Sequence, residues 1–120
     1  MIKLIYCFRK RSGMTGEEFN RYWRDVHAAL GARIPGLRRF VQSRMIEIPG
    51  DVRRADFDGV AELWFDDVEA LLAARASRKW REAGLDEEHF LDPATTAYAV
   101  TEERAIPLAS EATGEPRVDR

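Results

Sequence analysis

The chain alternates between stretches with apolar side chains at every second position and stretches where they recur every three or four residues. The two-residue alternation is typical of strands, which we expect at residues 2–8, 37–48, 59–65 and 95–101. The longer spacing is typical of amphipathic helices, which we expect from Thr15 to the Pro35-Gly36 pair and from Asp66 to Gly84. The order strand, helix, strand, strand, helix, strand is that of a split βαβ arrangement. The pattern therefore predicts an α+β, ferredoxin-like fold with a four-stranded antiparallel sheet.

Local signals support both expected helices. Thr15 and Glu18 have the spacing of a capping box, so each side chain would satisfy a free backbone donor at the start of the first helix. The expected buried stripe of this helix consists of Phe19, Tyr22, Trp23, Val26, Leu30 and Ile34. Asp66 is the expected cap of the second helix. The expected buried stripe of that helix consists of Val68, Leu71, Leu72, Ala76 and Trp80.

Both faces of the expected sheet carry apolar side chains. In the first strand, Ile2, Leu4, Tyr6 and Phe8 share one face, whereas Ile5 and Cys7 share the other. Two helices can cover only one face of such a sheet, so the second face needs another apolar layer. A second copy of the chain is the economical source of that layer. We therefore expect a homodimer whose two sheets form a barrel, with a small apolar or aromatic molecule bound in its interior.

Composition limits the class of protein. The chain has 120 residues, 45% hydrophobic and 33% charged, which suits one domain, expected at 1–106, with a loose tail at 107–120. No apolar run approaches the roughly 20 residues that cross a bilayer, and signal-peptide features are missing, so we expect a cytoplasmic protein without a membrane partner. Cys7 is the lone cysteine and there are two histidines, so no metal is expected. The first half is basic and the second acidic, but the arginines are dispersed and no binding motif accompanies them, so nucleic acid is not an expected partner.

His27 is the leading candidate for chemistry. It lies at the edge of the apolar stripe of the first helix, where partial desolvation would keep the imidazole neutral near pH 7 and able to exchange a proton. The alternative is a boundary histidine that is satisfied by a single hydrogen bond. Spacing alone leaves both interpretations open.

Four segments of the chain resemble the EthD family: MTGEEF at 14–19, YWRDVHAAL at 22–30, PGL at 35–37 and FLDP at 90–93. The resemblance covers most of residues 2–105 and implies a dimeric α+β barrel. Related barrels include a methylmuconolactone methylisomerase and aromatic polyketide cyclases or dehydratases, which use neither a metal nor an organic cofactor. A helix histidine often lies at the pocket in these relatives, and His27 is the matching residue. Ala29 stands where many members have proline, which weakens the transfer of any particular activity.

The remaining candidate residues each have a structural alternative. Asp92 matches an acidic position of the family and would orient His27 or act as a second acid or base, or it merely caps the turn before Pro93. Glu62 would serve as an acid if it faced the barrel interior, or would pair with an arginine at the rim. Arg44 would stabilise an enolate or a carboxylate, unless it is exposed. The aromatic candidates for binding a ligand, for which simple packing is the alternative, are Tyr6, Trp23, Trp64 and Tyr98.

These observations predict a small enzyme without a cofactor. His27 would move a proton next to a carbonyl of an apolar cyclic or polyketide-like molecule, in an isomerisation, cyclisation or dehydration. Two alternatives keep the same pocket: oxygenation of an aromatic ring without a cofactor, or ligand binding by a non-catalytic accessory protein.

Overall fold

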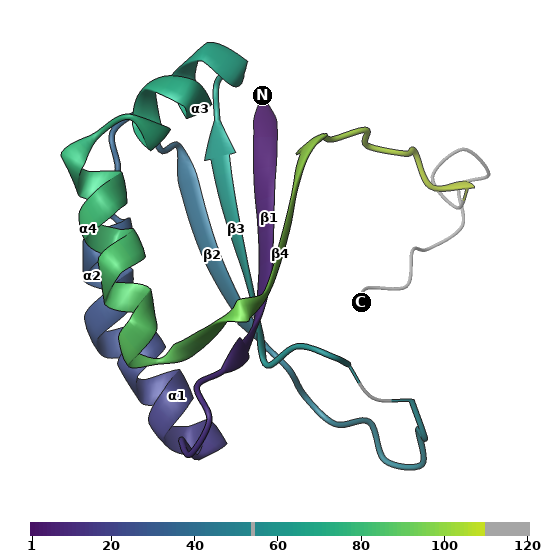
Figure 1. The fold of residues 1–120 in the computed structure, drawn as a ribbon. Helices are drawn as coiled ribbons and strands as arrows, with labels where there is room; N and C mark the ends of the chain where they lie inside the picture. Colours follow the sequence, from purple (N-terminus) through teal and green to yellow (C-terminus); the bar gives the residue numbers. More distant parts are fainter. Residues whose placement is uncertain (54, 110–120) are drawn as a thin grey trace.

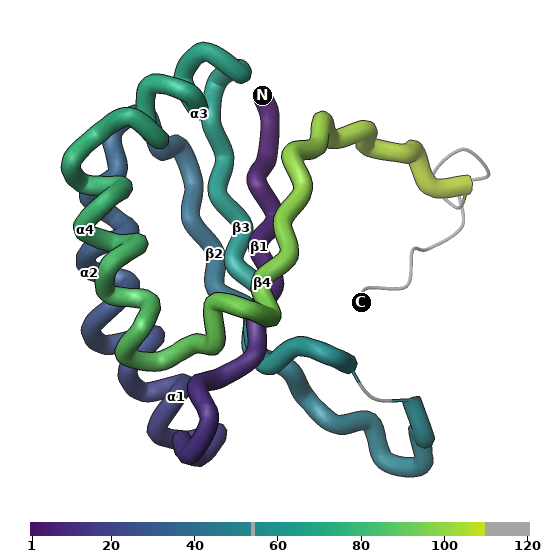
Figure 2. Tube along the Cα trace, viewed as in Figure 1, coloured from purple at the N-terminus to yellow at the C-terminus, as the bar shows by residue number. Residues whose placement is uncertain are grey.

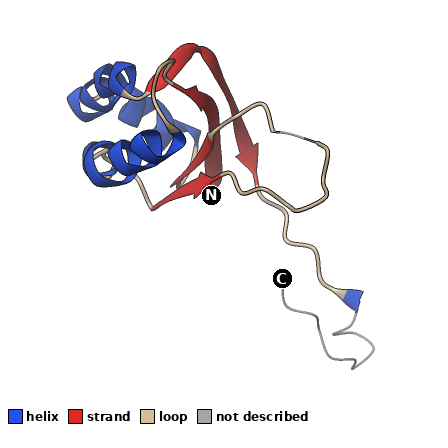
Figure 3. Ribbon diagram, turned by 90° about the horizontal axis from the view of Figure 1, so that it is seen from below, coloured by secondary structure: helices blue, strands red, loops and turns tan. Residues whose placement is uncertain are grey.

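The computed structural model describes residues 1–53 and 55–109, and it has two layers: a sheet and the helices that cover one of its faces (Figures 1 and 3). The elements in chain order are β1 (Ile2–Lys10), α1 (Gly16–Tyr22), η1 (Trp23–His27), α2 (Ala28–Gly31), β2 (Arg39–Arg44), β3 (Gly59–Phe65), α3 (Val68–Arg75), α4 (Arg78–Asp86), η2 (Glu87–His89) and β4 (Leu91–Glu102). The strand order is β2-β3-β1-β4, and every neighbouring pair is antiparallel. This arrangement confirms the α+β, ferredoxin-like fold. Most of the expected tail, residues 110–120, lies outside the described residues.

The core lies between the helices and one face of the sheet. Its fully buried large side chains are Phe8, Phe19, Phe65, Phe90 and Leu91. A β-carbon at Gly59 would lie 2.9 Å from the ring of Trp23, so glycine at this position lets the first helical segment approach the sheet closely. The described residues between β2 and β3, and residues 103–109 after β4, reach away from this two-layer body (Figure 2).

The first helical segment begins at the expected cap, but the helical turn in its middle is wider than that of an α-helix. Thr15 and Glu18 form the expected capping box. From Trp23 to His27 the segment is a π-helix, in which the Ala28 N–H donates to the carbonyl of Trp23 five residues earlier. The wider turn changes which side chains face the sheet, and it corrects one part of the expected stripe: Val26 is 43% exposed, whereas the His27 side chain is largely buried beside the core.

The second expected helix is in fact two helices, which corrects the prediction of one helix from Asp66 to Gly84. Asp67, not Asp66, caps α3, and Ser77 caps α4 by accepting a hydrogen bond from the Trp80 N–H at 3.2 Å. Gly84 lies inside α4, which continues to Asp86. Three members of the expected stripe, Val68, Leu72 and Ala76, are exposed. The break at Ser77 changes the direction of the chain, so one helical periodicity does not describe both parts.

The outer strands also differ in length from expectation. β2 is shorter than the expected 37–48, whereas β4 starts earlier than the expected residue 95 and contains Pro93. β4 is an edge strand, where a missing N–H is tolerated. Among the described helices, none has the length and apolar character that crossing a membrane requires.

Candidate functional site

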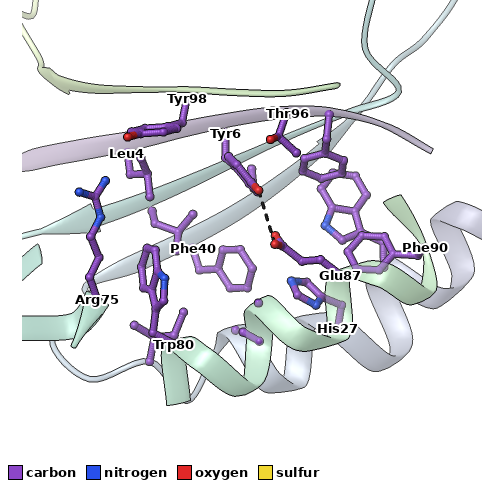
Figure 4. A pocket seen from close by; sticks show the side chains of 18 residues that line it. Leu4, Tyr6, His27, Phe40, Arg75, Trp80, Glu87, Phe90, Thr96 and Tyr98 are labelled. Carbon is purple, nitrogen blue, oxygen red and sulfur yellow. Dashed lines mark hydrogen bonds between the residues drawn. The ribbon is translucent and has the colours of Figure 1, made fainter. Parts of the chain in front are cut away.

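A pocket of about 320 Å³ lies between the helices and the face of the sheet that they cover (Figure 4). Its walls are mostly apolar, with Leu4 and Phe8 from β1, Phe40 from β2, Leu63 from β3 and Ala83 from α4 among the lining residues. The polar groups that reach it come from Tyr6, His27, Arg75, Glu87, Thr96 and Tyr98. An apolar cavity with a few convergent polar groups is the usual form of a small-molecule site.

His27 is held by a carboxylate that the sequence did not single out. Its Nδ1 lies 3.0 Å from Oδ2 of Asp86, and the other oxygen of Asp86 accepts a 2.6 Å hydrogen bond from the hydroxyl of Tyr22. We assign the proton to Nδ1, because a carboxylate can only accept. The Nε2 atom then carries the lone pair, and it makes no hydrogen bond within the described part of the chain.

The surroundings of His27 favour its neutral form. The His27 and Asp86 side chains are only 12% and 11% exposed, and the imidazole lies 4.7 Å from the ring of Phe90, centroid to centroid. Burial lowers the pKa of His27, and the hydrogen bond to Asp86 opposes this effect only in part. A neutral imidazole with one fixed proton and one free lone pair is a suitable general base.

Glu87 and Tyr6 form a second polar pair in the pocket. The Tyr6 hydroxyl lies 3.5 Å from Oε1 of Glu87, a long hydrogen bond (Figure 4). Burial, with repulsion from Asp86, raises the pKa of Glu87 to about 7, although the bond from Tyr6 opposes the shift. Burial likewise raises the pKa of Tyr6 to about 12. Both groups can therefore hold a proton at neutral pH and donate it to a ligand oxygen.

Four of the residues that the sequence singled out line this pocket: Tyr6, Trp23, His27 and Tyr98. Asp92 does not contact His27. Its Oδ1 accepts a hydrogen bond from the Ala94 N–H at 3.1 Å, as in the alternative of a turn cap, and the position beside the imidazole belongs to Asp86. Arg44 is exposed and lies near Glu17, Asn20, Arg21 and Arg24, outside the pocket.

Glu62 and Trp64 lie on the opposite face of the sheet. They pair in register with Ile5 and Lys3, the side chains of β1 that point away from the helices. Glu62 forms a 2.9 Å salt bridge with Lys3, and the indole N–H of Trp64 donates to Glu103 at 2.6 Å. The pocket of this chain therefore lies on the helix side of the sheet, whereas Glu62 and Trp64 lie on the face where a second copy is expected.

Sequence reasoning missed Asp86, Glu87 and Arg75. Asp86 ends α4 and Glu87 begins η2, both beyond the expected end of the second helix at Gly84. Nothing in the sequence relates Asp86 to His27, which lies 59 positions earlier. Only the docking of α4 beside the first helical segment brings them together. Within residues 1–53 and 55–109, no group of three or more His, Cys, Asp or Glu side chains is placed to hold a metal ion.

Comparisons with known proteins agree with this fold. The family model described as the EthD domain matches residues 11–94. An EthD (ethyl tert-butyl ether d) family protein from Bacillus halodurans has 26% identity and a TM-score of 0.73, covering 87% of this chain and 99% of that chain.

Two more distant structures share the fold. A dimeric ferredoxin-like protein of unknown function from Thermobifida fusca has 17% identity and a TM-score of 0.64, over 83% of this chain and 88% of its own. SnoaB, a cofactor-independent oxygenase from Streptomyces nogalater, has 20% identity and a TM-score of 0.61, over 88% of this chain and 94% of its own. The comparison with curated proteins gives no match.

Proposed function

The chain belongs to the EthD family, and from that premise we propose that it is a small enzyme in which His27 moves a proton next to a carbonyl group of an apolar cyclic compound. The observation that carries this proposal is the 3.0 Å contact of Asp86 with Nδ1 of His27 at the wall of an apolar pocket. This contact leaves Nε2 free as a proton acceptor. Isomerisation, cyclisation and dehydration all begin with such a proton transfer, which requires no cofactor.

Each polar group has a distinct part in the proposed reaction. Nε2 of His27 takes a proton from the carbon beside the carbonyl, and the electron pair of the broken C–H bond moves onto the carbonyl oxygen as an enol forms. Glu87, whose pKa is raised to about 7, donates a proton to that oxygen, with the hydroxyl of Tyr6 beside it. Asp86 and Tyr22 are positioning residues, because they fix the orientation and the tautomer of His27.

Hydrogen–deuterium exchange tests the proposal without knowledge of the product. The bicyclic ketone 2-tetralone, incubated with the protein in D₂O, would exchange its α-protons faster than in buffer alone, as followed by proton NMR. We expect His27→Asn to slow this exchange by about 10²- to 10⁴-fold, because the base is removed while the shape of the pocket is kept.

His89→Asn is the matched control, since His89 is exposed and does not line the pocket. It should leave the exchange rate unchanged. Equal exchange by the wild type and His27→Asn would contradict the proposed role of His27. Binding of 2-tetralone without any faster exchange would favour the accessory, ligand-binding alternative.

Oxygenation is a second candidate, which the similarity to the cofactor-independent oxygenase SnoaB favours. The same base would then take the proton of a phenol, and the electron-rich ring would react with O₂. Measurement of O₂ uptake with an oxygen electrode distinguishes oxygenation from the proposed proton transfer, because proton transfer alone consumes no O₂. Uptake of O₂ with 1,3-dihydroxynaphthalene that depends on His27 would support oxygenation.

We also propose that the chain forms a homodimer through the sheet face that the helices leave open. This face has an apolar surface that consists of Ile5, Cys7, Val41 and Val60, and Figure 3 shows that the helices packed against the sheet lie on its other side. The similarity to dimeric ferredoxin-like proteins supports this arrangement. Two such faces packed together would cover each other.

A further inference from the structure

The end of the pocket opposite His27 and Glu87 holds a permanently charged side chain. Arg75, the last residue of α3, lies there with Trp80 of α4 and Tyr98 of β4 (Figure 4). Tyr98 is 64% exposed, so this end is open to solvent. The pocket thus has a charged mouth and a proton-transfer end, with apolar walls between them.

Arg75 is held by aromatic rings and not by an acid. Its guanidinium carbon lies 5.5 Å from the ring centre of Tyr98 and 6.0 Å from that of Trp80. Within the described residues, its N–H groups have no carboxylate or carbonyl partner, unlike Arg38, which donates two hydrogen bonds to Asp66. Stacking against rings fixes a guanidinium while leaving its donor edge available.

This chemistry suits one class of ligand. The five N–H donors of a guanidinium match the two oxygens of a carboxylate, and the resulting charge-assisted pair is stronger and more directional than a neutral hydrogen bond. Among the described residues that line the pocket, Arg75 is the only arginine or lysine. A carboxylate on the ligand would give this cation an acceptor that the described residues do not supply.

We propose that the pocket takes a ring compound with a carboxylate substituent, whose carboxylate pairs with Arg75 while its ring system reaches His27. This inference rests on the proposed function, because it names the substrate class of the same pocket. It also assigns Arg75 as the residue that determines specificity for acids over neutral analogues and that orients the ring along the pocket.

Calorimetric titration with 2-naphthoate and its neutral counterpart 2-naphthamide tests the inference. We expect the wild type to bind the carboxylate at least about tenfold more tightly than the amide. Arg75→Gln should abolish this preference while changing the affinity for the amide by less than about threefold. Arg75→Lys keeps the positive charge but cannot form a bidentate pair with the carboxylate, so it should retain only part of the preference for the carboxylate over the amide. Arg78→Gln, an exposed position on α4 outside the pocket, is the control and should behave as the wild type.

The outcomes separate this inference from the proposed function. Equal affinity of the wild type for the two compounds, or a preference that survives Arg75→Gln, would overturn the role of Arg75 and leave the proton-transfer site intact. Failure of both compounds to bind the wild type would count against the pocket as an aromatic site, and so against the proposed function as well. The wild-type comparison decides the question even if a variant does not fold.

Discussion

Asp86 and Glu87 are adjacent in the sequence, but they lie in different surroundings and are suited to different tasks. Asp86 accepts hydrogen bonds from Tyr22 and His27. Among the described residues, the carboxyl group of Glu87 has only the long contact with Tyr6, and burial raises its pKa to about 7. Two carboxyl groups in unlike environments are a common basis for dividing positioning and acid roles between residues.

The raised pKa of Glu87 makes the stability of the protein depend on pH. In the folded chain this pKa is about 7, against an ordinary value of 4.5, so the fold loses stability as pH rises through this window. Glu87→Gln removes the ionising group. We expect this variant to match the wild type near pH 4 and to exceed its free energy of unfolding by roughly 3 kcal/mol near pH 8.

Urea unfolding at both pH values measures this difference. Glu88→Gln is the matched control, because Glu88 is the exposed neighbour in η2 and should show no such dependence on pH. The same gain for Glu87→Gln at both pH values would show that the carboxyl group does not titrate in this window.

At the scale of elements, the sequence predicted where helices and strands occur better than how the helices are interrupted. The capping box at Thr15 and the bounds of β3 are confirmed, because they rest on local signals. The π-helix at Trp23–His27 gives no periodicity signal of its own, since one wide turn shifts an apolar stripe by a single position. It is tied to the sheet by Gln42, whose side chain donates to the Trp23 carbonyl at 2.9 Å.

The candidate site shows the same limit of sequence patterns, which indicate the direction of a side chain but not how separate helices pack together. His27, Tyr6, Trp23 and Tyr98 could be found from strand and helix patterns, because these patterns show which side chains point inward. Asp86, Glu87 and Arg75 could not be found in this way, since their positions depend on how α3 and α4 dock after the break at Ser77. Glu62 and Trp64, which the sequence places at the ligand site, lie on the open face of the sheet, away from the pocket of this chain.

At the scale of the whole molecule, the proposed dimer and the pocket use opposite faces of one sheet. Val60 lies on the open face, where it pairs in register with Cys7 and Ser43. We expect the wild type to sediment at twice its chain mass of 13.8 kDa and Val60→Lys to sediment at the chain mass, because an unpaired charge would be buried in the interface.

The comparison of the wild type with Val60→Lys by sedimentation velocity needs a control variant that adds the same charge outside the proposed interface. Val52→Lys introduces the same charge at a side chain that is 94% exposed, so it should leave the mass unchanged. A wild type that sediments at 13.8 kDa would contradict the proposed dimer, without any consequence for the pocket.

Cytoplasmic residence, expected from the sequence, stays a prediction.

The central claim is that His27 is a neutral imidazole with its proton on Nδ1 and a free Nε2. The most direct measurement is a pH titration of the ¹⁵N chemical shifts of the His27 ring, with His89→Asn used to assign the signals. We expect the Nδ1–H tautomer near pH 7 and a midpoint below the ordinary 6.5, because burial lowers the pKa of His27. A proton on Nε2, or a midpoint above 6.5, would contradict the account of His27 as the base.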